Sequence, residues 1–436
     1  MLLQKPAFLL FYHARAAEAS FGEWLGVLWH GLSLDCTVAG YVTAFPVLVV
    51  LASFWIPLSQ RVWRIVLTVY FSLIALVTAA IFAVDLNLYG YWGFRLDGSV
   101  LIYLSDPGEA LASASWGEVL RQILIMLVYA GAMIWSYRWI LRLFRVEPVP
   151  LRGRVVPTVA ALLIGGLTFL AIRGGVTVAT ANVSKVYFSS NMFLNHAATN
   201  PVFSFLSSVG DNENYAEAYP FFEEERRKTL FEELRGNRPG ADAGTPRLLR
   251  SDRPNVVLIL LESFGRTIMD ETVNGEPVMP NMQRFKREGV WFENFFANSF
   301  RTDRGQVAVL CGFPAQTTMS IMKLPRKSAT LPSLARSLGR EGYRSVFMYG
   351  GDLNFTNQAS FMYSTGWEEL IWQKDMQLDA PTSKWGYADD VVVDLFGDEV
   401  EALGREEQPF LAGLLTLSSH EPFEVPFAKF DDKLLN

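Results

Sequence analysis

The segment 298–306 combines residue types that suit the transfer of a phosphoryl or sulfuryl group. It reads NSFRTDRGQ, so Arg301 and Arg304 flank the pair Thr302 and Asp303, and an apolar stretch follows. This order predicts a helix that begins here, with Thr302 or Asp303 as its N-cap. A helix N-terminus favours anions, and a hydroxyl beside a divalent cation loses its proton more easily. Thr302 could therefore attack phosphorus or sulfur while the two arginines neutralise the oxyanions.

Three apolar stretches of the same region end in an ionisable residue: 256–261 before Glu262, 344–349 before Asp352, and 410–417 before His420. Short stretches of this kind predict strands buried on both faces, as in parallel sheets that are covered by helices. Ligands bind beyond the carboxyl ends of such strands. A single carboxylate in this place is more often a helix cap or a surface group, but three strand ends together favour a catalytic rim.

The residues between these strands show further helix and strand patterns. Residues 282–288 and 328–341 predict helices, and residues 290–296 predict a strand. Asp389 and Asp390 are expected to cap a short helix that runs to about Phe396. Alternation of this kind predicts an α/β domain with a mainly parallel sheet in residues 251–436.

The first part of the chain is too apolar for an ordinary soluble protein. Hydrophobic residues make up 50% of the whole sequence, and four of its stretches are long enough to cross a bilayer: 37–56, 65–84, 123–141 and 155–172. We therefore predict a transmembrane domain in residues 1–173. Within it, residues 1–35 are expected to form a helix stub and an interfacial segment, and residues 85–117 an aromatic-rich interfacial loop.

Arginines set the expected orientation of this domain. They crowd the loop between the third and fourth spans, which the positive-inside rule assigns to the cytoplasm. Everything after residue 173 then faces outward, as does residue 35, so we expect one more span before residue 1. The net charge of −6 gives no electrostatic reason to expect a nucleic-acid partner.

Residues 174–250 are expected to connect the two domains. The part 174–210 mixes small, polar and aromatic residues and is expected to lie along the membrane surface. Residues 221–234 (FFEEERRKTLFEEL) predict a helix, and residues 236–250, which are rich in proline and glycine, predict a linker.

Four motifs follow one another along the chain: NVVLILLESF at 255–264, RTDRG at 301–305, KWGYAD at 384–389 and LSSHEPF at 417–423. Their order and spacing resemble those of the lipoteichoic acid synthase/phosphoglycerol transferase family, in the sulfatase branch of the alkaline phosphatase superfamily. The multi-span membrane half also fits, so the resemblance covers nearly the whole chain. It implies an α/β domain of the alkaline phosphatase/sulfatase type outside the cytoplasmic membrane of a bacterial cell.

The resemblance also implies roles for matching residues. Glu262 matches a metal-ligand carboxylate, and Thr302 matches a nucleophile that also ligates the metal, either Mn²⁺ or Mg²⁺. His420 matches a histidine that contacts the transferred headgroup. The other expected substrate contacts are Arg301, Arg304 and Asp352. The implied reaction is in-line attack of Thr302 on a phosphatidylglycerol-like phospholipid, release of diacylglycerol, and transfer from the phosphothreonine to a glycan or lipid acceptor.

Two features depart from the family pattern. Family members carry an Asp-His pair downstream of the His420 motif that supplies two more metal ligands, and no such pair follows residue 420 here. We therefore expect a chain that is truncated at this end and inactive in this form. Synthases of the lipoteichoic type also have Trp and Arg after Gly350, whereas residues 351–358 here read GDLNFTNQ, which leaves the headgroup open.

Two other function classes remain open at this point. A sulfatase or a phosphoethanolamine transferase of the same superfamily would use the same nucleophile. A non-catalytic membrane protein would instead use the α/β domain to bind an anionic glycan or lipid.

Overall fold

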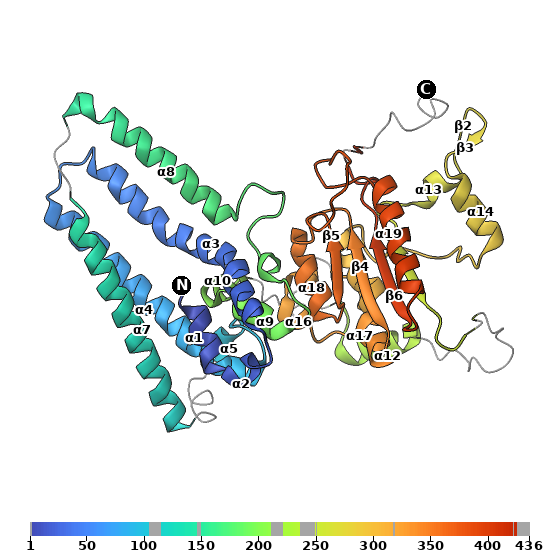
Figure 1. The fold of residues 1–436 in the computed structure, drawn as a ribbon, viewed down its shortest axis with the longest axis horizontal. Helices are drawn as coiled ribbons and strands as arrows, with labels where there is room; N and C mark the ends of the chain where they lie inside the picture. The colour runs from blue at the N-terminus through green and yellow to red at the C-terminus, as the bar shows by residue number, and fades with distance from the viewer. Residues whose placement is uncertain are drawn as a thin grey trace.

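The computed structural model describes residues 2–103, 115–145, 150–210, 221–235, 249, 251–316, 319–421 and 423–424 of the 436-residue chain. Figure 1 shows a helical half and an α/β half, which meet beside the short helices that follow the membrane helices in sequence. The predicted fold class, a multi-span helical domain followed by an α/β domain with a parallel sheet, is confirmed.

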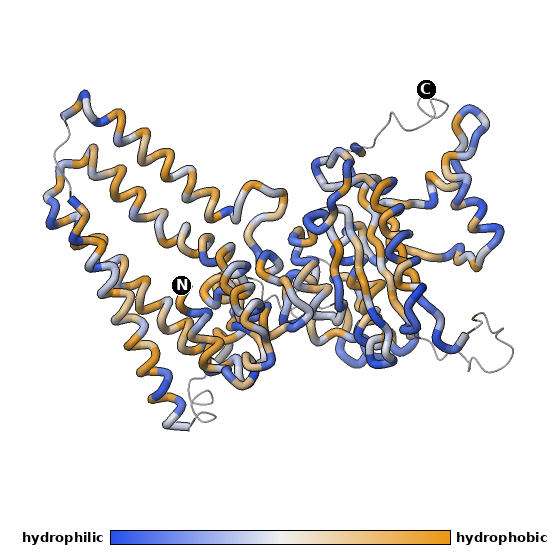
Figure 2. Tube along the Cα trace, viewed as in Figure 1, coloured by the Kyte–Doolittle hydropathy of each residue, from blue (hydrophilic) through white to orange (hydrophobic). Residues whose placement is uncertain are grey.

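Four helices of the first half are long and apolar enough to cross a membrane. They are α3 (Phe21–Ser53), α4 (Gln60–Trp92), α7 (Trp116–Leu143) and α8 (Val155–Arg173). Helices α4, α7 and α8 each contain a whole predicted span, whereas α3 ends at Ser53 and leaves residues 54–56 of the first predicted span outside the helix. Large apolar side chains stay exposed along them, as at Leu163, which is 67% exposed, and Figure 2 shows the apolar character of all four helices. Such surfaces are stable in a bilayer and not in water.

Two expectations for this half were wrong. Residues 24–34 are not an interfacial segment, because α3 begins at Phe21 behind a capping box formed by Ser20 and Glu23. Residues 85–92 are not a loop, because α4 continues to Trp92 and ends only at Gly93, which has a φ of 69°. Of the remaining predicted loop, α5 (Val100–Tyr103) is helical and residues 104–114 lie outside the described part of the chain.

Short helices pack together at one end of the membrane helices. They are α1 (Gln4–Phe11), α2 (His13–Ala16), η2 (Val183–Val186), α9 (Met192–Ala198) and α10 (Pro201–Ser208). Phe8 of α1 and Leu194 of α9 share a buried core with Leu34 and Leu86 of the membrane helices. Residues 174–210 are thus a packed cap on the helix ends. Helix α12 (Glu224–Arg235) lies where a helix was predicted, and the predicted linker lies outside the described residues except for Leu249.

The α/β half contains a parallel sheet with the strand order β1-β6-β4-β5. Its strands are β1 (Val256–Leu260), β4 (Arg344–Tyr349), β5 (Glu369–Trp372) and β6 (Phe410–Leu415). All three neighbouring pairs are parallel, so the carboxyl ends of the strands meet at one edge. A separate antiparallel pair joins β2 (Thr272–Val273) to β3 (Glu276–Pro277).

Helices cover both faces of this sheet. One face packs against α15 (Thr302–Cys311), α17 (Leu334–Arg340) and α18 (Gln358–Ser364), and the other against α19 (Asp389–Gly404). The smaller helices are α13 (Arg266–Met269), α14 (Pro280–Glu288), η3 (Ile321–Lys323), α16 (Pro325–Ser328) and η4 (Phe355–Asn357). This layering places the amino end of α15 beside the carboxyl ends of β1 and β6.

Several local predictions for this domain need correction. Strand β1 is not buried on both faces: Val257 and Ile259 are each 47% exposed, because the core on the α19 side of the sheet covers β4 and β6 and includes no residue of β1. Residues 290–296 form no strand in the described structure, and Phe292 and Phe296 are exposed. The helix predicted at 328–341 is interrupted near Pro332, after which Ser333 caps α17.

Two helix starts also differ from the prediction. The N-cap of α15 is Arg301, so Thr302 is the first helical residue and neither it nor Asp303 is the cap. Helix α19 runs to Gly404, well beyond Phe396, and its N-cap is Ala388. Asp389 and Asp390 lie in its first turn, where negative charge is favourable to the helix.

Candidate active site

A short hydrogen bond joins the end of β1 to the start of α15. Thr302 Oγ1 donates to Glu262 Oε2 at 2.8 Å, across a separation of 40 residues in sequence. Both side chains are half-buried, so the pair is accessible from solvent. The hydroxyl also stands in the first turn of a helix, where unpaired backbone N–H groups give a local positive potential.

The backbone around Glu262 is fixed by the neighbouring strand. Glu262 N donates to Thr416 Oγ1 at 2.8 Å, and Thr416 N donates to Leu260 O at 3.0 Å. The following residue, Ser263, has a φ of 58°, and its hydroxyl donates to Glu262 Oε1 at 3.1 Å. A non-glycine residue in this left-handed region costs free energy and is often found at functional sites. Each carboxylate oxygen of Glu262 thus has one hydroxyl donor.

The two arginines of the RTDRG motif have different surroundings. Arg301 has a side chain that is 50% exposed, and its Nε lies 3.7 Å from Asp303 Oδ1. Arg304 is 8% exposed, with its guanidinium carbon 5.7 Å from the ring centre of Phe300. Within the described chain, Arg304 Nε has no hydrogen-bond partner. Arg301 can reach an anion in solvent, whereas Arg304 supplies a buried positive charge at the start of α15.

Three carboxylates influence one buried tyrosine at the end of β4. Burial raises the pKa of Tyr349, and the negative charges of Glu262, Asp352 and Asp389 raise this pKa further. Asp352 follows β4 and accepts a 2.9 Å hydrogen bond from Asn354 N. The ends of β1 and β4 therefore lie close enough for their carboxylates to influence the same tyrosine, as we expected for a parallel sheet. The structure shows no direct bond between Asp352 and Thr302 among the described residues.

His420 lies after β6 and packs on Trp385. Their ring centres are 4.3 Å apart, His420 Nδ1 lies 2.9 Å from Glu421 O, and Trp385 Nε1 donates to the same carbonyl at 2.9 Å. No hydrogen bond within the described ranges joins His420 to Thr302 or Glu262. The structure therefore brings Thr302 and Glu262 into contact and leaves His420 as a separate, half-buried part of the same edge.

Asp389 holds the segment that leads to His420. Its two carboxylate oxygens accept hydrogen bonds from Leu417 N at 2.7 Å and Ser418 N at 2.8 Å. Burial raises the pKa of Asp389, and these N–H donors oppose the rise. We expected Asp389 to cap a helix, whereas its side chain positions the end of β6. The KWGYAD motif was the signal in the sequence, since it contributes both Trp385 and Asp389.

The donor chemistry of the pair fits a hard divalent cation. Glu262 and Thr302 present oxygen atoms 2.8 Å apart, and Mg²⁺ and Mn²⁺ prefer oxygen ligands. Among the residues that the structure describes, no group of three or more His, Cys, Asp or Glu side chains could hold a metal ion.

Comparison with known proteins finds similarity in the α/β half. Residues 254–433 match the family model described as sulfatase, and this region follows the helical membrane half in sequence. Phosphoglycerol transferase I of Xanthomonas campestris is 35% identical over 183 residues, covering 39% of this chain and 26% of the relative. Lipoteichoic acid synthase 1 of Bacillus subtilis is 30% identical over 191 residues, covering 39% and 27%. The aligned part of the chain spans about a quarter of the length of these relatives.

Two solved structures are also similar to this chain. An alkaline phosphatase superfamily protein of Vibrio parahaemolyticus is 30% identical, with a TM-score of 0.39 over 42% of this chain and 45% of that one. A lipoteichoic acid synthase of Listeria monocytogenes is 22% identical, with a TM-score of 0.39 over 41% and 44%.

Proposed function

We propose that this protein is a membrane-anchored transferase that moves a phosphoglycerol-type group from a phospholipid to a glycan or lipid acceptor. The observation that carries the proposal is the 2.8 Å hydrogen bond from Thr302 to Glu262 at the start of α15. A sulfatase-family domain with relatives named phosphoglycerol transferase I and lipoteichoic acid synthase supports the choice of reaction. The membrane helices support a lipid substrate.

Thr302 is the proposed nucleophile. Its Oγ1 forms a bond to the lipid phosphorus, while the bond from phosphorus to the diacylglycerol oxygen breaks and that oxygen takes up a proton. Glu262 orients the hydroxyl by accepting its hydrogen bond, and the first turn of α15 and Arg304 offset the negative charge of the phosphate. A hydroxyl of the acceptor then attacks the phosphothreonine, and Thr302 recovers its proton.

Glu262 and Thr302 are also the proposed ligands of a divalent cation, Mn²⁺ or Mg²⁺. When bound, such an ion would lower the pKa of the threonine hydroxyl. Arg301, Asp352 and His420 are proposed to contact the headgroup, because all three lie at or beside the edge where the strands end. His420 is held for this role by its contact with Trp385.

We further propose that the catalytic domain faces outward from the bacterial cytoplasmic membrane. The support is the arginine-rich stretch after α7, which the positive-inside rule assigns to the cytoplasm, and the position of the α/β half at the opposite ends of the helices (Figure 1).

Headgroup selectivity separates this function from its alternatives. The purified full-length protein would be incubated with Mn²⁺ and with phosphatidylglycerol, phosphatidylethanolamine or an aryl sulfate, and Thr302 would be examined by mass spectrometry. We expect a glycerophosphate adduct on Thr302 and release of diacylglycerol from phosphatidylglycerol. An adduct of phosphoethanolamine or sulfate alone would favour the other enzyme classes, and the absence of every adduct would favour a binding protein.

A further inference from the structure

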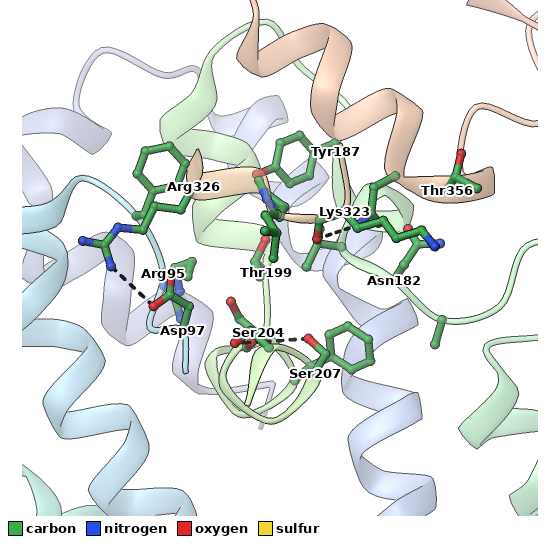
Figure 3. Close-up of a pocket in the computed structure, with 18 of the residues that line it drawn as sticks. Arg95, Asp97, Asn182, Tyr187, Thr199, Ser204, Ser207, Lys323, Arg326 and Thr356 are labelled. Atoms are coloured by element: carbon green, nitrogen blue, oxygen red, sulfur yellow. Dashed lines mark hydrogen bonds and ion pairs between the residues drawn. The ribbon is translucent and has the colours of Figure 1, made fainter. Parts of the chain in front are cut away.

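A cavity of about 740 Å³ lies between the membrane half and the catalytic domain. Figure 3 shows its lining, which comes from five segments: 94–99, 178–187, 196–208, 323–327 and 355–357. The first two segments follow directly on the ends of α4 and α8, so the cavity opens beside the membrane boundary. It is separate from the Thr302 hydroxyl, which does not line it.

The charged residues around the cavity are mainly basic. Arg95 comes from the membrane half, and Lys323, Arg326 and Lys327 come from the catalytic domain. The acidic lining residue Asp97 is already paired, since Arg326 Nη1 lies 3.4 Å from its Oδ1. Lys323 and Lys327 are exposed on the lining. The excess of positive charge favours an anionic ligand.

Two buried polar side chains face the cavity with unused hydrogen-bonding capacity. Arg95 and His196 are each 5% exposed. Arg95 Nη2 pairs with Asp85 Oδ2 at 3.0 Å, but its Nε and Nη1 have no hydrogen-bond partner in the described structure. His196 Nδ1 lies 3.1 Å from the hydroxyl of Tyr89, and its Nε2 likewise has no partner there. Buried groups of this kind are normally satisfied, so they point to a ligand that carries oxygen atoms.

The remaining lining combines hydroxyl groups with apolar surface. Ser204 and Ser207 of α10 lie on one side of the cavity (Figure 3), and Phe94, Phe203 and Phe355 supply aromatic surface. A small inorganic anion would leave these rings without contacts. A ligand with a charged head, hydroxyl groups and an apolar body would use the whole lining.

Two structural links connect the cavity with the candidate active site. Phe355 packs on Trp385 at 5.5 Å between ring centres, and Trp385 packs on His420. Ser320, just before η3, donates to Asp303 O at 2.9 Å, beside Thr302. The lining residues Thr356 and Asn357 have φ values of 52° and 65°, so the loop after Asp352 holds two strained residues at the cavity.

We propose that this cavity binds the phosphate headgroup of an anionic glycerophospholipid at the membrane boundary, beside the site of transfer. The inference rests on the proposed function, since it gives the donor lipid a binding site from which it would pass to Thr302. Lys323 and Lys327 contact the phosphate, Arg95 and His196 bond to headgroup oxygens, and the rings contact the start of the acyl chains.

The test uses the full chain in detergent with Thr302→Ala, which binds lipid without turning it over. Binding of dihexanoyl phosphatidylglycerol, kept below its critical micelle concentration, is compared with binding of sn-glycerol 1-phosphate and of dihexanoyl phosphatidylcholine. We expect the anionic lipid to bind at least about tenfold more tightly than either, because only it satisfies both the charges and the apolar surface. Equal affinity for glycerol phosphate or phosphatidylcholine would overturn the proposal.

Two further variants locate the binding. K323Q/K327Q removes exposed charges, and S207W fills the cavity from an exposed position on α10. Each should weaken binding about tenfold, whereas K286Q, which changes a lysine on α14 away from the cavity, should not. Unchanged affinity in both cavity variants would reject the site. Because binding is measured without turnover, that result is distinct from a failure of the transfer assay, which would reject the proposed function instead.

Discussion

The hydroxyl of Thr302 donates a 2.8 Å hydrogen bond to the carboxylate of Glu262, although 40 residues separate them in sequence. The contact arises because α15 packs on the sheet with its first turn at the edge where β1 ends, close to Glu262. Thr416, the residue directly after β6, accepts a hydrogen bond from Glu262 N and so holds the Glu262 backbone there. The reactivity of the site should therefore depend on both residues in different ways.

Replacing Thr302 should abolish transfer. Thr302→Ala removes the proposed nucleophile, and we expect release of diacylglycerol to fall at least about a thousandfold. Thr302→Ser keeps a hydroxyl and should retain part of the rate. Thr272→Ala, an exposed threonine of β2, is the control. Equal rates for Thr302→Ala and the unmodified protein, measured with labelled phosphatidylglycerol, would rule out the nucleophile.

Removal of divalent cations should stop the reaction reversibly. EDTA should abolish activity, and Mn²⁺ or Mg²⁺ should restore it. Glu262→Gln removes the carboxylate charge and should raise the Mn²⁺ concentration needed for half-maximal activity at least about tenfold. Glu276→Gln, on the separate β2–β3 pair, should behave like the unmodified protein. Full activity in EDTA would contradict a role for a metal.

The buried His196 of α9 should make the stability of the folded protein depend on pH. Burial, and then the positive charges of Arg95 and Arg15, lower the pKa of His196 to about 3. The unfolded chain binds this proton near pH 6.5 and the folded chain does not. His196 therefore makes its full contribution to the stability of the folded state above about pH 6.5, and this contribution is lost as the pH falls towards 3.

The measurement is thermal unfolding in detergent at pH 7.5 and pH 5. The drop in melting temperature between them should be smaller in His196→Gln, which keeps a polar side chain that cannot be protonated. An identical drop in both proteins would mean that His196 is not responsible.

Arg326 should stabilise the contact between the catalytic domain and the membrane half. Its Nη1 lies 3.4 Å from Asp97 Oδ1 and donates to Ser99 Oγ at 2.6 Å, and its guanidinium carbon is 4.2 Å from the ring centre of Trp92. Charge-assisted bonds of this kind contribute about 1–3 kcal/mol. Arg326→Ala should accelerate amide hydrogen exchange in residues 97–99 about tenfold or more, whereas Arg340→Ala on α17 should leave it unchanged.

Gly386 should tolerate no side chain. Its φ is 145°, and a Cβ would lie 2.1 Å from Gly350 O at the end of β4. Gly386→Ala should destabilise the catalytic domain by about 1–3 kcal/mol and displace the neighbouring Trp385. Gly397→Ala, inside α19 with nothing within 4 Å, should be neutral or stabilising. Equal melting temperatures for the two variants would contradict this account.

Much of the architecture could be predicted from the sequence because it depends on long apolar stretches. The predicted strand 344–349 coincides with β4, and three of the four predicted spans lie inside one long helix, while the span 37–56 extends past the end of α3 at Ser53. The carboxyl ends of the strands meet at one edge because all neighbouring strands of the sheet are parallel. Short elements escaped prediction: β5 has four residues, and its burial comes from neighbours rather than from its own pattern.

The residues that support the candidate site could not be predicted from the sequence. Thr416 and Ser263 support Glu262 through a backbone bond and a left-handed φ, and neither leaves a pattern in the sequence. The exposure of one face of β1 could not be predicted, because Val257 and Ile259 are as apolar as their less exposed neighbours. The metal and substrate roles of Glu262, Thr302, Arg301, Arg304, Asp352 and His420 stay predictions.

Hydrogen bonds between the membrane half and the catalytic domain determine how the two are held together. Asn182 Nδ2 donates to Asn354 O at 2.8 Å, and Ser360 N donates to Ser184 Oγ at 3.0 Å, next to the Arg326 contacts. These bonds hold the catalytic domain against the ends of the membrane helices. The position of Thr302 relative to those helices therefore depends on these bonds and not on the length of chain between residues 235 and 251. Inserting residues into that stretch should leave the domain docked in the same place.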